Sequence, residues 1–195
     1  MAGYFPIIGR IRAQICSVRI LQMFRVIHRR FAANPLNAVP SPSRFSDPSG
    51  NYAVLYGAET VSCCLWEAVV RNSLIRRPHR VIPRSVFALS QVVEFKSTQD
   101  LRLVDLQDDG PIWIGAPPEV VHESNHHEGR SLSEDVYSHL HEADGFLYSS
   151  RYTGHVCCAI FDRAIMLKLA TVSDTPLNQH PDLGNTLSDY DITSI

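Results

Sequence analysis

The 195-residue chain lacks the features of a membrane protein and of a protein that binds nucleic acid through bulk charge. It contains no run of about 18 consecutive apolar residues, which a membrane-spanning helix requires. Its formal net charge is −2, so it has no general attraction for nucleic acid or for anionic lipid. We therefore expect a soluble globular protein that binds neither of these directly.

The common glycine-rich nucleotide-binding motifs are also absent. Neither G-x-G-x-x-G nor G-x-x-x-x-G-K-[ST] occurs, so a nucleotide that binds here does not use a Rossmann turn or a P-loop. The C-x-x-C spacing of many metal sites is missing, and the number of cysteines is odd. These absences favour free, buried thiols in a cytoplasmic protein. The cysteines are Cys16, Cys63, Cys64, Cys157 and Cys158.

Acidic residues are missing from the first 46 residues, which carry seven arginines. Four apolar residues there follow helical spacing: Ile7, Ile11, Ile15 and Val18. Residues 1–23 are therefore predicted to form a basic, amphipathic arm that is disordered or contacts a partner, such as a second copy of the chain. A transit peptide has a similar composition. Residues 171–195 contain no lysine or arginine and are predicted to form an acidic C-terminal extension.

Residues 24–170 contain the succession of strands and helices expected of one compact domain. Strands are predicted at residues 52–56, 86–95, 101–106, 145–150, 156–161 and near 165–169. Helices are predicted at 60–71, which is apolar on nearly all sides, and at 131–142, where Ser131 and Glu134 form a capping-box pattern. Because strands and helices do not alternate strictly, we expect an α+β fold with mixed small sheets and flanking helices.

A few polar side chains in this domain are candidates for chemistry. Glu67 lies on the buried helix, where it either forms a surface ion pair with Arg71 or lies at the floor of a cleft. Arg44 stands in a loop and offers a fork of donors to a phosphate, and Tyr56 ends a predicted strand. Ser149, Ser150 and Arg151 follow another strand. Taken singly, every one of these except Glu67 has a more ordinary explanation as a solvated or core side chain.

A competing pattern is H-E-x-x-H, formed by His122, Glu123 and His126. On a helix the two histidines would share a face and bind zinc, and the glutamate would act as general base. However, Pro117-Pro118 precedes the motif, Gly129 follows it, and the stretch has no apolar face to bury. A zinc metallopeptidase is therefore an unfavoured alternative, and we predict no metal site.

Several short segments, in order, resemble the RES domain family, which is named for an arginine, a glutamate and a serine. The segments are RFSDP at 44–48, VLY at 54–56, LWEA at 65–68 with Arg71, ADGFLYSSR at 143–151 and AIFDRA at 159–164. The resemblance runs from about Phe24 to Leu169. It implies a fold similar to the ADP-ribosyltransferases of the diphtheria-toxin type.

The resemblance also implies an activity. RES domains consume NAD⁺ by hydrolysis or phosphorolysis, or transfer ADP-ribose to a protein, and many are toxins of bacterial toxin–antitoxin pairs with a DNA-binding antitoxin. NAD⁺ would be the substrate, with no further cofactor. The alternative is a non-enzymatic binding protein whose RES site is degenerate.

Carried over to this chain, the family's functional residues fall on Arg44, Tyr56, Glu67 and Ser150, with Ser149 as the fallback for the serine. Glu67 would stabilise the positive charge that grows on the ribose as nicotinamide leaves, as carboxylates do in glycosidases. Arg44 would hold the pyrophosphate or ribose side, and Tyr56 would pack against nicotinamide. Ser150 would hydrogen-bond nicotinamide or ribose, and Arg151 is expected to contribute to NAD⁺ binding.

Overall fold

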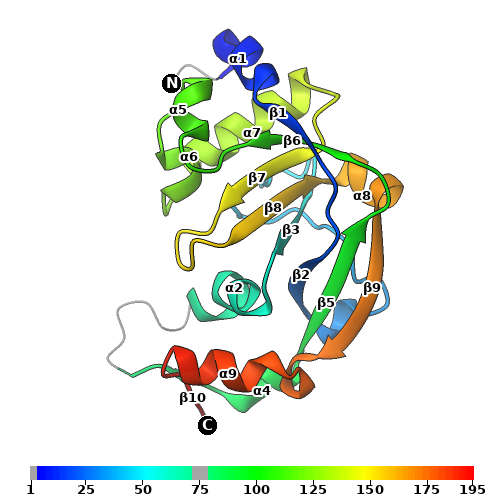
Figure 1. Cartoon of the computed structure of the whole chain (residues 1–195), viewed down its shortest axis with the longest axis vertical. Coiled ribbons are helices and arrows are strands. Elements are labelled where there is room, and N and C mark those ends of the chain that lie inside the picture. The colour runs from blue at the N-terminus through cyan, green and yellow to red at the C-terminus, as the bar shows by residue number, and fades with distance from the viewer. Residues whose placement is uncertain (1–3, 72–78) are drawn as a thin grey trace.

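The computed structural model describes residues 4–71 and 79–195 and shows one large curled sheet with short helices around it (Figure 1). The strands of this sheet are β1 Ile15–Val18, β2 Met23–His28, β3 Val54–Ala58, β5 Ser90–Ser97, β6 Leu101–Asp105, β7 Gly145–Ser149, β8 Val156–Phe161 and β9 Leu169–Pro176. Their order is β1-β6-β7-β8-β3-β2-β5-β9, with β6 and β7 parallel and the other neighbours antiparallel. A separate parallel pair joins β4 Val81–Ile82 to β10 Thr193–Ser194. The predicted α+β class is confirmed, although eight strands join one sheet where small sheets were expected.

The helices are short and lie on both sides of the sheet (Figure 1). They are α1 Ile8–Ala13, α2 Val61–Leu65, α4 Arg84–Ala88, α5 Gly110–Ile114, α6 Glu119–His122, α7 His127–His139, α8 Asp162–Lys168 and α9 Asp182–Asp189. A π-helical turn, Trp66–Val70, continues α2, and 3₁₀ turns occur at Phe5–Ile7, Arg29–Phe31 and Leu177–Gln179. In the described residues no helix combines the length and apolar character needed to cross a membrane.

The sheet opens between β3 and β2, the fifth and sixth strands in its order. β2 and β3 are in register at the single pair Phe24↔Ala58, whereas β2 pairs with β5 along its whole length and β3 with β8 likewise. A strand pair held at one point can diverge, and side chains from both strands then face the space between them. This opening sets the position of the cavity described below.

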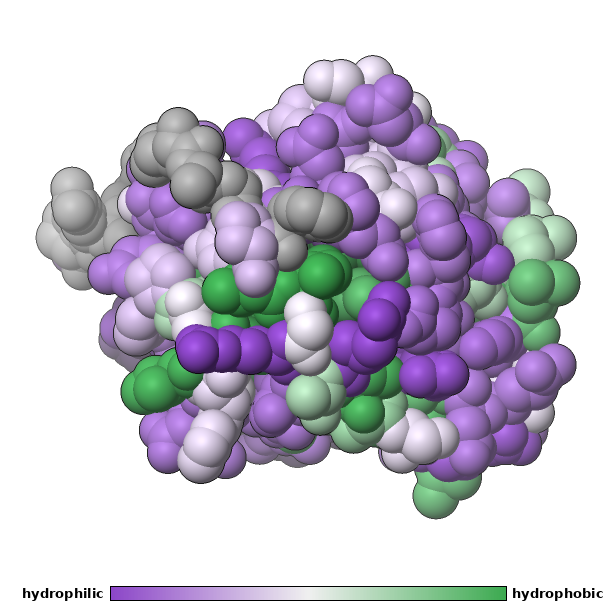
Figure 2. Space-filling view, turned by 90° about the horizontal axis from the view of Figure 1, so that it is seen from above, coloured by the Kyte–Doolittle hydropathy of each residue, from purple (hydrophilic) through white to green (hydrophobic). Residues whose placement is uncertain are grey.

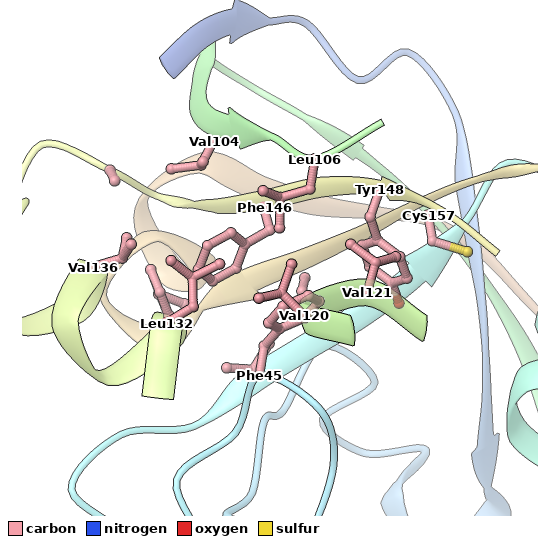
Figure 3. Packing of buried hydrophobic residues seen from close by; sticks show 14 of the residues in the cluster. Phe45, Val104, Leu106, Val120, Val121, Leu132, Val136, Phe146, Tyr148 and Cys157 are labelled. Atoms are coloured by element: carbon pink, nitrogen blue, oxygen red, sulfur yellow. The ribbon is translucent and has the colours of Figure 1, made fainter. Parts of the chain in front are cut away.

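A core of aromatic and aliphatic side chains fixes the sheet against α6 and α7 (Figure 3). Phe45 stacks on Phe146 with ring centroids 4.6 Å apart, and Val120, Leu132 and Val136 close over them. All five are fully buried, and each such side chain stabilises the fold by about 1.5–3 kcal/mol. The face shown in Figure 2 is, by contrast, mostly hydrophilic, with small apolar areas.

The N-terminal segment, predicted to be an arm outside the domain, is part of it. Residues Ile15–Val18 form β1, which pairs with β6, so the predicted helix ends at Ala13. Ile11 is fully buried, Arg12 pairs with Glu142 at 2.8 Å, and the Tyr4 hydroxyl donates to a carboxylate oxygen of Glu128 at 2.6 Å. The helical spacing of four apolar residues was misleading, because two of them, Ile15 and Val18, belong to β1 at the edge of the sheet.

Of two further predictions near the C-terminus, the first needs correction. Residues 165–169, predicted as a strand, lie mostly in α8, where Met166 and Leu167 are 86% and 70% exposed. An apolar run normally indicates a buried strand, and here it lies on an exposed helix instead. The acidic extension is ordered: β9 carries it along β5, and β10 pairs with β4.

Two element boundaries also moved. The strand predicted at 86–95 begins only at Ser90, because residues 84–88 form α4. α7 begins at His127, four residues before the predicted cap at Ser131, and ends at His139. The helix at 60–71 is confirmed, and the Thr60 hydroxyl caps it by accepting a hydrogen bond from the backbone N–H of Cys63.

Candidate active site

A cavity of about 230 Å³ lies where β2 and β3 diverge. It is lined from β2, β3, α2 with its π-helical turn, the end of β7 and the loop before Phe45. Five of the six predicted site residues line it: Arg44, Tyr56, Glu67, Ser149 and Arg151. Among the described lining residues the charged groups are four arginines and the single carboxylate of Glu67. Such a wall suits a ligand with several negative charges and one developing positive charge.

Glu67 and Ser150 meet at the floor of this cavity, although 83 positions separate them. The Ser150 hydroxyl donates to one carboxylate oxygen of Glu67 at 2.7 Å, and Ser150 is only 3% exposed. The other oxygen of Glu67 lies 3.5 Å from Arg71. Both explanations of Glu67 from the sequence therefore hold, because the loose ion pair exists and the carboxylate faces the cavity. The charged hydrogen bond from Ser150 fixes the carboxylate's direction.

Tyr56 positions the loop that carries Arg44. Its hydroxyl accepts a hydrogen bond from the backbone N–H of Phe45 at 2.8 Å. Burial raises the pKa of Tyr56, so the hydroxyl stays neutral. From the other side, the Ser133 hydroxyl donates to the carbonyl of Phe45 at 2.6 Å. The sequence suggested a nicotinamide contact for Tyr56, and the structure shows in addition that Tyr56 holds this loop.

Arg44 and Arg151 both hold the connection between α6 and α7. Arg44 donates to the carbonyl of Glu123 and Arg151 to that of His122, each at 2.9 Å. Arg44 is 9% exposed, and burial lowers its pKa. It fits only because residue 129 is glycine: a β-carbon there would lie 2.6 Å from Cγ of Arg44.

Arg25 and Arg71 are functional candidates that sequence reasoning missed. Arg25 of β2 donates to the carbonyl of Asn37 at 3.2 Å, while its buried Nε has no hydrogen-bond partner among the described residues. Burial lowers the pKa of Arg25 to about 10, and the guanidinium remains charged. Arg71 was noticed only as an ion-pair partner of Glu67, and no sequence signal pointed to Arg25. Their free donors make them the natural anion ligands of the cavity.

The H-E-x-x-H stretch does not form one helix. α6 ends at His122, Glu123 is extended, and His126 has a left-handed backbone with φ of 64° before α7 begins. The two histidines therefore cannot share a helical face, which removes the basis of the zinc-peptidase interpretation. In the described part of the chain, no group of three or more histidine, cysteine or acidic residues is placed to hold a metal.

His126 lies instead at the arginine cluster. Its Nδ1 is buried and has no hydrogen-bond partner within the described residues. Burial, and then the charges of Arg44, Arg71, Arg130 and Arg151, lower the pKa of His126 to about 4. The ring is therefore neutral at pH 7, and it adds no charge to the site.

The fold and the cavity define a class of α+β domain with known members. The structure is similar to a chain in the crystal structure of the M. tuberculosis MbcT–MbcA toxin–antitoxin complex, with a TM-score of 0.68 and 14% sequence identity. This similarity covers 88% of the present chain and 91% of that chain. Residues 22–180 match the RES domain model, and the chain belongs to the RES domain family. It is also 33% identical over 95 residues to the probable toxin y4kH of Sinorhizobium fredii (strain NBRC 101917 / NGR234), which is 48% of this chain and 74% of that protein.

Proposed function

We propose that this protein breaks the nicotinamide–ribose bond of NAD⁺ and serves as the toxin of a toxin–antitoxin pair. The observation that carries the enzymatic part is the carboxylate of Glu67, oriented by Ser150 at 2.7 Å in a cavity with four arginines. The toxin role is supported by membership of the RES family, by the similarity to y4kH and by the fold shared with a toxin–antitoxin complex. The partner would then be an antitoxin, of the DNA-binding kind.

The arginines would bind the pyrophosphate of NAD⁺. Two phosphates carry two negative charges, and guanidinium groups bind phosphate oxygens through paired, charge-assisted hydrogen bonds. In the described residues Arg71 has only the loose 3.5 Å contact with Glu67, and Arg25, which donates to the carbonyl of Asn37, keeps a buried Nε without a hydrogen-bond partner. Arg44 and Arg151 also donate to backbone carbonyls, and their bonds hold the connection between α6 and α7. We therefore assign the main pyrophosphate contacts to Arg25 and Arg71, with Arg44 beside them.

Glu67 would supply the electrostatic part of the reaction. When the C–N bond breaks, its electron pair leaves with nicotinamide, which becomes neutral, and positive charge develops on the ribose. A carboxylate held against that ring stabilises the charge more in the transition state than in the substrate. The hydrogen bond from Ser150 keeps the half-buried carboxylate in a fixed orientation. No proton has to reach the leaving group, so the site does not require a second acid.

The acceptor completes the reaction. Water would give ADP-ribose, phosphate would give a phosphorylated ADP-ribose, and a protein side chain would become ADP-ribosylated. The open mouth of the cavity allows each of these to reach the ribose carbon. A binding protein with an inactive site is the remaining alternative.

The test is to incubate the purified protein with NAD⁺ and to separate the products by chromatography. Nicotinamide together with ADP-ribose would identify hydrolysis, and phosphate-dependent release would identify phosphorolysis. Labelled NAD⁺ in a cell extract would reveal transfer to a protein. If no condition releases nicotinamide or labels a protein, the enzymatic proposal is wrong and the binding alternative replaces it.

A further inference from the structure

Two buried thiols that the proposed NAD⁺ reaction does not use lie in contact beside the site. The sulfurs of Cys63 and Cys157 are 3.6 Å apart, although the residues are 94 positions apart in the chain. Cys63 lies on α2 and is 0% exposed, and Cys157 lies on β8 and is 1% exposed. Neither forms a disulfide, and both are free thiols. The fold therefore holds two reduced sulfurs close enough to react with each other after a small movement.

The pair has access to small molecules through the cavity. Cys157 is one of the lining residues, and it is paired across the sheet with Tyr148, which lines the cavity as well. Figure 3 shows the two side chains next to each other at the edge of the core. Cys63 precedes Glu67 by four residues on the continuous helix formed by α2 and its π-helical turn. A small oxidant that enters the cavity therefore meets Cys157 at its wall, and it reaches the buried Cys63 sulfur, 3.6 Å further in, when the wall opens locally.

The two thiols differ in acidity. The hydrogen bond from Cys157 is the main cause that lowers the pKa of Cys63. The same contact, in which Cys157 is the donor, raises the pKa of Cys157, and burial raises it further. Because the thiolate is the nucleophilic form, Cys63 is the sulfur suited to attack and Cys157 the one suited to resolve.

We propose that Cys63 and Cys157 form an oxidation site in which a hydroperoxide joins them as a disulfide. In the first step the Cys63 thiolate attacks one peroxide oxygen, an S–O bond forms, the O–O bond breaks, and hydroxide leaves. In the second step the Cys157 sulfur attacks the Cys63 sulfenic acid, the S–S bond forms, and the hydroxyl leaves as water with the Cys157 proton. The hydroxide takes up the proton that Cys63 released on ionisation, so overall two thiols lose two electrons and two protons, and one hydrogen peroxide becomes two waters.

Forming the disulfide would also move residues of the cavity. The loss of activity that we expect from this movement rests on the proposed NAD⁺ cleavage. A disulfide requires a sulfur–sulfur distance of about 2.05 Å, so α2 and β8 must approach by up to ~1.5 Å at this point. Glu67 belongs to the same continuous helix as Cys63, and Ser150 directly follows β7, the strand next to β8. Since a misplacement of about 1 Å can cost up to ~10²-fold in rate, we expect at least a roughly tenfold loss of NAD⁺ cleavage, reversed by dithiothreitol.

The neighbouring Cys64 provides a matched control. It also lines the cavity, but its thiol donates to the carbonyl of Phe24 at 2.7 Å rather than to a sulfur. Burial raises its pKa, so it lacks thiolate character. If exposure to the cavity alone decided the reactivity toward peroxide, Cys64 would react as readily as Cys63 and Cys157. The proposed mechanism requires in addition a second sulfur in contact, which Cys64 lacks in the described residues.

The experiment is to treat the full-length protein with hydrogen peroxide and to map its peptides without reduction. We expect a linked peptide pair containing Cys63 and Cys157 in the parent and in Cys64→Ser. Cys157→Ser should instead yield a Cys63 sulfenic acid that dimedone traps. The absence of the linked pair from the oxidised parent, or equal oxidation of Cys64, would overturn the proposal.

Peptide mapping of the parent needs no variant to fold and no NAD⁺ activity, so it is independent of the proposed function. If the linked pair forms but the reduced protein releases no nicotinamide, the proposed function fails and the oxidation site stands. If the reduced protein is active and the oxidised one is equally active, the predicted effect on the cavity is wrong.

Discussion

The two sides of the cavity are built differently. On the carboxylate side, Glu67 and Ser150 are joined by a short hydrogen bond within the protein, and the sulfurs of Cys63 and Cys157 touch below them. On the arginine side, positive charges are concentrated but several donors are unused in the described residues, above all on Arg25. A group whose orientation is fixed by hydrogen bonds within the protein suits a catalytic role. A charged group with unused hydrogen-bond donors suits ligand binding. We infer from this difference that the carboxylate side would carry out the reaction and that the arginine side would bind the substrate.

The largest effect should follow from removing the charge on the carboxylate side. Glu67→Gln keeps the size and can still accept from Ser150, but it cannot stabilise a positive ribose. We expect kcat for nicotinamide release to fall about 10²–10³-fold with KM changed little. Glu94→Gln, at a half-buried position of β5, is the control and should behave like the parent. Equal loss in both variants would show that general destabilisation, not the site charge, is responsible.

The arginine side should respond in binding instead. Arg25→Ala or Arg71→Ala removes charge-assisted donors worth about 1.5–3 kcal/mol each, so KM for NAD⁺ should rise roughly 10–100-fold. kcat should stay within about threefold of the parent, and Arg84→Ala, exposed on α4, should change neither constant. A fall in kcat without a change in KM would contradict the assignment of substrate binding to the arginine side.

Gly129→Ala tests whether the position of Arg44 matters for substrate binding and for stability. The added carbon would lie 2.6 Å from Cγ of Arg44 and 2.9 Å from two backbone oxygens, so the Arg44 loop or α7 must move. We expect kcat/KM to fall about tenfold and stability by about 1–3 kcal/mol. Gly184→Ala on α9, whose new carbon would meet nothing within 4 Å, should not destabilise. Thermal unfolding and steady-state kinetics on both variants test this.

The smallest effect concerns pH. The pKa of His126 is lowered to about 4 in the fold, so between about pH 6.5 and pH 4 the unfolded chain binds a proton that the folded one does not. Stability should therefore decline as pH falls through this range. His126→Asn tolerates the left-handed backbone and should remove part of this decline, by about 1 kcal/mol for a partly screened ring. Chemical denaturation at pH 7 and pH 4.5 measures it, and identical pH slopes would contradict the assignment.

Much of the site could be predicted from the sequence because its residues stand in recognisable segments. The helix that carries Glu67 was predicted from its apolar pattern, and β8 was predicted with its observed bounds. The arrangement of Arg44, Glu67 and Ser150 around one cavity followed from their order in a family pattern. The roles of these residues stay predictions until they are measured.

The remainder depended on tertiary contacts that no local pattern encodes. Residues 15–18 became a strand because β6 offers them a paired edge, and α8 exposes the apolar Met166 and Leu167. Arg25 lies on a strand without any motif, and its role emerges only where β2 and β3 separate. The contact of Cys63 with Cys157 likewise joins distant segments.

The most direct test is to measure NAD⁺ binding by isothermal titration calorimetry in the Glu67→Gln background, where the substrate would persist. The account predicts that Glu67→Gln binds NAD⁺, and that adding Arg25→Ala and Arg71→Ala weakens the affinity at least about tenfold while Arg84→Ala does not. Equal affinity with and without Arg25 and Arg71, or no binding to Glu67→Gln at all, would contradict the assignment of this cavity to NAD⁺.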